Sequence, residues 1–164
     1  MAQITKLKEE DRGHVRALEL FILKEYLEAM LNRKWEELNQ EFVDQLGASS
    51  KGAFEHYLKE GMSFVAKEDG QIVGFVFAQM VPHMSNIPKL GWIESIGVHP
   101  SHRRKGIGYQ LLRKVCQESK KKGAMAVQSA IMPENSKSLL LHKKLGFFLD
   151  ARKLAFLDLD TFKG

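Results

Sequence analysis

The sequence has few of the residues that cross-link or interrupt a chain. It contains one cysteine, Cys116, and four prolines in 164 residues. A single cysteine excludes an internal disulfide framework and is typical of proteins in a reducing compartment. The longest mostly apolar stretch, 72–81, is far too short to span a membrane, and the N-terminus is acidic where a signal peptide has an apolar core. We therefore expect a cytoplasmic protein with no membrane partner.

The remaining composition is that of an ordinary globular protein. Hydrophobic residues make up 44% of the chain and charged residues 27%. Twenty-five basic against 20 acidic residues leave a formal net charge of +5. This excess suits a polyanionic partner such as nucleic acid or a phosphorylated cofactor, although a solvated basic surface gives the same balance. No repeat, low-complexity tract or linker divides the chain, so one domain over residues 1–164 is expected.

Apolar periodicity predicts a mixed α/β fold in which strands and helices alternate late in the chain. Strands are expected at residues 4–8, 62–67, 72–80, 90–98, 126–131, 148–150 and 153–159. Helical spacing predicts two helices within 11–46, broken near Asn32–Arg33, and further helices at about 49–59, 106–122 and 135–145. Asp69-Gly70 predicts a hairpin turn, whereas residues 82–88, bounded by two prolines, are expected to form a loop. Parallel pairing is expected only around the two late strand–helix units.

The most informative segment joins an expected strand to an expected helix. Strand 90–98 is followed by His99-Pro100-Ser101-His102 and then by Arg103-Arg104-Lys105-Gly106-Ile107-Gly108-Tyr109. The first N–H groups of a helix lack internal partners and carry partial positive charge, and glycines there let an anion approach the backbone. With three cationic side chains beside them, residues 103–109 predict a pyrophosphate site. A basic loop with a glycine N-cap is the structural alternative, and neither the P-loop nor the Rossmann pattern is present.

Two motifs resemble those of the GNAT acetyltransferase superfamily. Arg103-x-x-Gly106-x-Gly108, after Val98-His99-Pro100, is similar to its coenzyme A signature. Asn135-Ser-Lys-Ser138-Leu-Leu-Leu-His142-Lys-Lys-Leu145-Gly146-Phe147 is similar to its second signature. The resemblance covers about residues 62–147, whereas the first sixty residues match only in kind. It implies a GNAT-like acyl-CoA N-acyltransferase fold: a mostly antiparallel sheet, flanked by helices, with a parallel pair splayed around the cofactor.

The resemblance implies acetyl-CoA as the co-substrate and assigns residues to it. The pantetheine arm would pair with the backbone of Ile96 and Val98. Arg103 would position the loop or pair with phosphate. Asn135 would cap the second helix, with a contact to the cofactor arm as a further role. The pyrophosphate would be held by the backbone N–H groups of the next six residues, which are Arg104, Lys105, Gly106, Ile107, Gly108 and Tyr109.

The implied reaction is direct attack of a neutral amine on the thioester in a ternary complex. An alkylamine is mostly protonated at neutral pH, so the reaction needs a base. Glu94 is the expected base, and strand periodicity places it on the same face as Ile96 and Val98; a structural carboxylate paired with a lysine or histidine is the alternative. The Val98 N–H would polarise the thioester carbonyl. The departing thiolate usually meets a tyrosine, but this chain has His142 there, which either donates a proton or packs beside the cofactor.

The predicted function is therefore N-acetyl transfer to a primary amine of a small molecule or a protein. The strand Ile-Glu-Ser-Ile resembles that of polyamine-type members, but a basic chain shows no obvious acidic trough for a polycation. A CoA-binding module of the same fold with little turnover is the alternative, which the missing tyrosine favours. Nucleic acid is not expected as a partner, because the basic clusters 103–105 and 120–122 are short. No metal is expected, because no histidine pair has ligand spacing, and a homodimer is expected by family analogy only.

Overall fold

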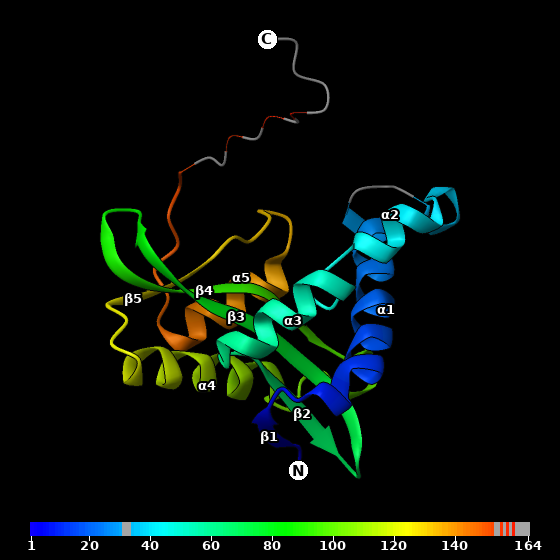
Figure 1. The fold of residues 1–164 in the computed structure, drawn as a ribbon, viewed down its shortest axis with the longest axis horizontal. Helices are drawn as coiled ribbons and strands as arrows, with labels where there is room; N and C mark the ends of the chain where they lie inside the picture. The colour runs from blue at the N-terminus through cyan, green and yellow to red at the C-terminus, as the bar shows by residue number, and fades with distance from the viewer. Residues whose placement is uncertain (31–33, 153–154, 156, 158, 160–164) are drawn as a thin grey trace.

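The structure, a computed structural model, describes residues 1–30, 34–152, 155, 157 and 159 (Figure 1). Within this part of the chain, no helix is both long and apolar enough to cross a membrane. The regular elements are, in chain order, β1 (Gln3–Lys6), η1 (Glu9–Asp11), α1 (Arg12–Met30), η2 (Trp35–Glu37), α2 (Gln40–Gln45), α3 (Lys51–Glu60), β2 (Phe64–Glu68), β3 (Gln71–Met84), β4 (Ile87–Val98), η3 (Pro100–His102), α4 (Ile107–Lys121), β5 (Ala126–Ser129) and α5 (Ser136–Leu145).

The strands form one sheet in the order β1-β2-β3-β4-β5. The first four strands pair in antiparallel fashion, and β5 lies parallel to β4. Helix α4 lies between β4 and β5 in the chain and provides the crossover that a parallel pair requires. This topology confirms the predicted α/β fold with a mostly antiparallel mixed sheet and one parallel pair.

The helices cover both faces of the sheet (Figure 1). On one face the apolar stripe of α4 joins Val76 and Ala78 in a buried cluster, against which Leu141 and Leu145 of α5 also pack. On the other face, α1 and α3 pack over Phe75 and Phe77. Alternate residues of β3 therefore enter opposite clusters, as the two-residue period of a strand requires. The side chains of the α4 stripe are Ile107, Leu111, Leu112 and Val115.

Helix α1 lies close against β4 because β4 has a glycine at the crossing point. A Cβ at Gly97 would stand 2.6 Å from Cδ1 of Ile22 and 2.8 Å from the ring of Phe75. Real Cβ atoms are essentially never that close to a heavy atom, so any side chain at this position would push α1 away. This contact fixes the distance between α1 and the part of β4 that follows the parallel pairing.

The prediction of a loop at residues 82–88 is wrong. Strands β3 and β4 continue through both prolines and meet in a two-residue turn at Ser85 and Asn86, which have φ of 54° and 61°. Strand β2 pairs with β3 only as far as Val76, and β5 pairs with β4 only from Leu90 to Ile93, so the hairpin is two-stranded around both prolines. Pro82 and Pro88 are tolerated there because each strand has an open side that needs no N–H donor.

Two other expectations are corrected. The second helix expected within 11–46 is reduced to the 3-10 turn η2 and the short α2, while the predicted break at Asn32–Arg33 lies outside the described residues. The strand expected at 148–150 has no regular structure, and Phe148 is 88% exposed. A segment becomes a strand only by pairing, and β5 is the last strand of the described sheet. Most of the strand expected at 153–159 lies outside the described residues.

Replacing Gly97 by alanine should destabilise the protein by about 1–3 kcal/mol, because the added methyl group overpacks the contact with Ile22 and Phe75. Gly13→Ala is the matched control, because nothing lies within 4 Å of a Cβ at Gly13 and alanine favours a helix by about 0.5–1 kcal/mol. Urea unfolding of both variants measures the difference. Equal stability of the two variants would contradict the close packing of α1 on β4.

Candidate active site

Strands β4 and β5 separate before β4 ends. Their parallel pairing runs from Leu90 opposite Ala126 to Ile93 opposite Ser129, where β5 stops. Strand β4 continues to Val98, and over these last residues it pairs only with β3. One side of β4 is therefore open from residue 94 onwards within the described structure.

The backbone groups that face this open side belong to Ile96 and Val98. The N–H of His99 donates to the carbonyl oxygen of Val73 on β3, at 2.9 Å. Because alternate residues of a strand direct their backbone groups to opposite sides, Gly97 and His99 face β3, and Ile96 and Val98 face away. The carbonyl oxygen of Val98 indeed accepts a hydrogen bond from Nε of Arg103, at 3.0 Å. An extended ligand can therefore pair with Ile96 and Val98 as an added strand.

The loop after β4 presents six consecutive backbone N–H groups, those of residues 104–109. Among the described residues, no group accepts a hydrogen bond from any of them. The first amide of α4 with a backbone acceptor is that of Gln110, which donates to Gly106 at 3.1 Å. Arg104 and Gly106 have φ of 67° and 81°, which turns the loop so that it leads directly into the helix. Six unpaired donors at a helix N-terminus form an anion-binding arrangement.

The cationic side chains of this loop differ in their contacts. The guanidinium of Arg103 donates to both carboxylate oxygens of Glu25 on α1, at 2.8 and 2.6 Å. These bonds lower the pKa of Glu25 and raise that of Arg103. Lys105 lies 3.6 Å from the carboxylate of Glu68. Arg104 is exposed and makes no ion pair within the described residues, so Arg104 is the cation that an incoming anion can engage without breaking a contact.

Glu94 is the extra residue of a β-bulge. Phe77 lies opposite Ser95 and Ala78 lies opposite Ile93, so Glu94 has no partner on β3. Glu94 and Ser95 consequently both line a cavity on the face covered by α1 and α3, whereas the side chains of Ile96 and Val98 pack on the α4 face. The prediction that Glu94 shares a face with Ile96 and Val98 is therefore wrong, because strand periodicity does not count a bulge.

The carboxylate of Glu94 is exposed and accepts a hydrogen bond from the indole N–H of Trp92, at 2.7 Å. Neither a lysine nor a histidine pairs with it among the described residues. Trp92 therefore orients the carboxylate without neutralising its charge, and the expected alternative of an ion-paired structural carboxylate has no partner in this part of the chain.

The cavity beside Glu94, which we call the β4 cavity, has a volume of about 340 Å³. Tyr57 from α3 is 6% exposed and lines it. Burial, together with the negative charges of Glu94 and Glu19, raises the pKa of Tyr57 to about 12, so the phenol keeps its proton at neutral pH. The complete lining is Glu19, Leu23, Gly47, Ala48, Ala53, Tyr57, Glu94 and Ser95.

Glu19 and Arg16 of α1 fix the wall of the β4 cavity. The buried carboxylate of Glu19 accepts hydrogen bonds from the N–H of Ala48 at 3.1 Å, the N–H of Ser49 at 2.7 Å and the Ser49 hydroxyl at 2.5 Å. Arg16 donates to the carbonyl oxygens of Leu46, Val43 and Asp44. Residues 43–49 are thus held at both their acceptor and their donor groups, which is how a segment with little secondary structure stays in place.

His142 is buried in α5, where it is 1% exposed. Its Nδ1 lies 2.8 Å from the carbonyl oxygen of Ser138, which can only accept, so Nδ1 carries the proton. Its Nε2 is buried without a hydrogen-bond partner among the described residues. Burial lowers the pKa of His142, so at neutral pH the ring is uncharged and Nε2 is an acceptor. Asn135 caps the same helix, with Oδ1 accepting from the N–H of Ser138 at 3.1 Å.

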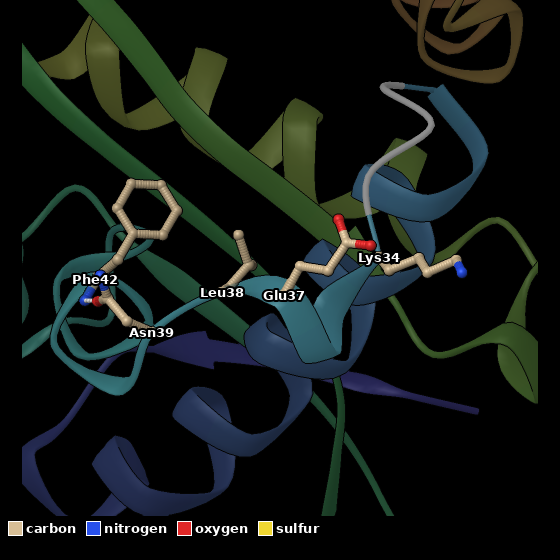
Figure 2. Close-up of a pocket in the computed structure, with 5 residues that line it drawn as sticks. All are labelled: Lys34, Glu37, Leu38, Asn39 and Phe42. Atoms are coloured by element: carbon tan, nitrogen blue, oxygen red, sulfur yellow. Dashed lines mark hydrogen bonds between the residues drawn. The ribbon is translucent and has the colours of Figure 1, made fainter.

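A second cavity, of about 340 Å³, is formed by η2 and α2. Figure 2 shows the residues that line it, which are Lys34, Glu37, Leu38, Asn39 and Phe42. No residue of the sheet, α4 or α5 contributes to its wall, so it shares no side chain with the loop or the open side of β4. In the described part of the chain, no group of three His, Cys, Asp or Glu side chains could hold a metal ion.

Three residues of this region were not predicted from the sequence: Glu19, Glu25 and Tyr57. A signal existed for Glu19, which lies four residues after Val15 and three before Ile22, on the apolar face of α1. A carboxylate on such a face is costly unless it is bound. Tyr57 lies within the helix expected at about 49–59, where the sequence gives no signal that separates it from a core aromatic residue. Nothing in the sequence links Glu25 to Arg103, because their contact depends on how α1 crosses the sheet.

Known proteins share this architecture. An N-alpha-acetyltransferase of Sulfurisphaera tokodaii is 35% identical over 103 residues, which are 57% of this chain and 62% of that protein. An aminoglycoside N(6')-acetyltransferase type 1 of Salmonella typhimurium is 35% identical over 89 residues, 52% of this chain and 61% of that protein. The chain therefore spans about three fifths of the length of these curated relatives. The solved structure of AAC(6')-Iy in complex with the bisubstrate analogue CoA-S-monomethyl-acetylneamine has a TM-score of 0.72 and 24% identity, covering 96% of this chain and 98% of that one.

The fold is that of the GNAT acetyltransferases, and the resemblance found in the two sequence motifs is confirmed. Within this class, the chain belongs to the family described as "Protein of unknown function (DUF1999)", which matches residues 3–164.

The buried His142 should make stability depend on pH. A histidine whose folded pKa lies below its unfolded value of about 6.5 takes up a proton on unfolding, so the free energy of unfolding should fall as pH drops below about 7. The contribution of one group is at most about 1.4 kcal/mol per pH unit. His142→Gln should remove this part of the slope, and the exposed His14→Gln should keep it. Urea unfolding between pH 5 and 8, about the range in which histidine titrates, measures the slope of the free energy of unfolding against pH for both variants. The same slope in His142→Gln and His14→Gln would contradict a buried neutral His142.

Proposed function

We propose that this protein is an N-acetyltransferase that moves an acetyl group from acetyl-CoA to a primary amine of a small molecule or a protein, by direct attack in a ternary complex. The observation that carries this proposal is the row of six unpaired N–H groups at 104–109, directly after the open side of β4. Phosphate needs donors of this kind, and an extended amide-containing arm needs an open strand edge. The relatives that are N-acetyltransferases support the same conclusion.

The residues present fit two parts of coenzyme A, the pyrophosphate and the pantetheine arm. The N–H groups of 104–109 and the free cation of Arg104 suit the pyrophosphate. The backbone of Ile96 and Val98 suits the pantetheine amides. Arg103 is committed to Glu25 and to the carbonyl of Val98, which supports a positioning role over direct phosphate binding. When bound, acetyl-CoA would supply the activated acetyl group.

Glu94 is the proposed base. Its carboxylate lines the β4 cavity, where an acceptor amine can lie, and Trp92 holds it in one orientation. An alkylammonium must lose a proton before it can attack, and a nearby carboxylate, directly or through water, can take that proton. The Val98 N–H remains the proposed donor to the thioester carbonyl.

His142 is better suited to packing than to proton donation. The neutral ring has its proton on Nδ1, which bonds to Ser138, and Nε2 has none to give. We therefore propose that the thiolate leaves without a proton donor, because it is stable enough as a leaving group. His142 instead packs in α5 against Phe147, with the two ring centroids 4.9 Å apart. The same observation favours the second candidate function, a CoA-binding module with little turnover. Turnover by the unmodified chain decides between the two.

Glu94→Gln should leave acetyl-CoA affinity within about twofold of the parent and lower kcat by about a hundredfold or more at neutral pH, because the amide cannot accept the proton. Thiol release with an amine acceptor measures the rate, and calorimetric titration measures affinity. Glu37→Gln, the same change in the wall of the other cavity, should change neither. Full activity of Glu94→Gln would assign the base elsewhere.

Arg104→Glu should weaken acetyl-CoA binding about tenfold to a hundredfold, because it replaces a charge-assisted contact by repulsion at the pyrophosphate. Lys120→Glu makes the same change in net charge at the other end of α4, where it should have little effect. Calorimetric titration of both variants compares them. Equal losses in the two variants would indicate general electrostatic attraction rather than a site at 104–109.

A further inference from the structure

The β4 cavity is lined by two carboxylates, by apolar side chains and by Tyr57 and Ser95, and among the described residues no lysine, arginine or histidine contributes to it. Glu19 and Glu94 reach it from α1 and β4, although the chain as a whole is basic. The nearest cation in sequence to Glu19 on the same helix, Arg16, directs its guanidinium to the carbonyl oxygens of residues 43–46 and does not line the cavity. The sequence showed no acidic trough because these carboxylates come together only in the fold.

The position of the Glu19 carboxylate is fixed by hydrogen bonds. Its carboxylate accepts from two backbone N–H groups and one hydroxyl, so both of its oxygens are held in place. A Cβ at Gly47 would stand 2.5 Å from Oε2 of Glu19, so this glycine is what lets the segment approach the carboxylate. Glu19 has no ion-pair partner among the described residues.

Tyr57 is a second and independent indication of a ligand. Its side chain is more than nine-tenths buried and lines the β4 cavity, yet its hydroxyl makes no hydrogen bond with the described residues. This hydroxyl is not one of the buried polar atoms that lack a partner among the described residues, so the buried ring carries an oxygen that remains accessible at the cavity. Glu19 and Glu94 line the same cavity as Tyr57. A phenol that keeps its proton and faces a carboxylate-lined cavity can accept a hydrogen bond from an ammonium group.

We propose that the acceptor is a small primary amine that carries a second positive charge, with the reacting amine at Glu94 and the second charge held between Glu19 and Tyr57. This inference rests on the proposed acetyl transfer and names its substrate class. The volume of about 340 Å³ lies in the range of small-molecule sites and suits a short aliphatic diamine. The apolar side chains of Leu23, Ala48 and Ala53 contact its methylene groups. Acceptors with a carboxylate or phosphate at the far end are disfavoured, because no cation in the wall would balance them.

Three acceptors with the same methylene chain test the charge of the far end: 1,5-diaminopentane, hexylamine and 6-aminohexanoate. Thiol release from acetyl-CoA by the full chain gives kcat/KM for each. We expect the diamine to exceed hexylamine by about tenfold, the effect of one charge-assisted contact, and 6-aminohexanoate to be the poorest. Equal values, or a preference for hexylamine or the amino acid, would overturn the inference and leave acetyl transfer itself intact.

Leu23 offers a matched pair of variants, because it lines the cavity without belonging to either buried cluster. Leu23→Lys puts a cation beside Glu19 and should lower kcat/KM for the diamine about tenfold while raising it for 6-aminohexanoate. Leu23→Met, of similar length and neutral, should change all three acceptors by one common factor. Tyr57→Phe should raise KM for the diamine more than for hexylamine. If Leu23→Lys also changed kcat/KM for all three acceptors by one common factor, the β4 cavity would not select acceptors by charge.

If none of the three acceptors is acetylated although acetyl-CoA binds, direct calorimetric titration of 1,5-diaminopentane separates the two proposals. Binding that Leu23→Lys abolishes and Leu23→Met preserves would support the cavity assignment and count against acetyl transfer to this acceptor. Absence of diamine binding to the parent chain would overturn the cavity assignment as well.

Discussion

Strand β4 loses its parallel neighbour after Ile93 but continues to Val98, and both proposed binding regions depend on this separation. On the open side, the backbone of Ile96 and Val98 has no strand partner among the described residues, and it leads into the N–H groups of 104–109, which have no acceptor there either. At the point of separation, the bulge at Glu94 turns two consecutive side chains toward α1 and α3. The proposed cofactor site therefore lies along the open side of β4, and the β4 cavity lies on the face of the same strand that α1 and α3 cover.

Helix α1 connects these two regions. Gly97 lets it lie directly on β4, through Ile22. One turn further on, Glu25 holds Arg103 and with it the loop that begins the anion site. One turn earlier Glu19, and a further turn earlier Arg16, hold residues 43–49 as the cavity wall. A displacement of α1 would thus affect the acceptor wall and the cofactor loop together, which is why the packing at Gly97 matters for function as well as stability.

The parts of the site that could be predicted from the sequence are those set by local chemistry. Glycine and charge at 103–109 predicted an anion site at a helix N-terminus, and Asn135 was predicted to cap α5, as it does. The side of the sheet that Glu94 faces could not be predicted, because a bulge depends on pairing with β3. The hairpin through Pro82 and Pro88 was missed for a related reason: whether a proline interrupts a strand depends on which of its sides is open. The acidic cavity required two carboxylates far apart in the chain.

The most direct test of the account is an NMR titration of the ¹⁵N-labelled full chain with coenzyme A. We predict that the largest changes fall on the amides of residues 104–109 and on those of Ile96 and Val98, since these N–H groups have no acceptor on β3 or in the loop. The amides of Gly97 and His99, which face β3, should shift less. Absence of binding, or changes confined to other parts of the chain, would contradict the assignment of this strand and loop to the cofactor.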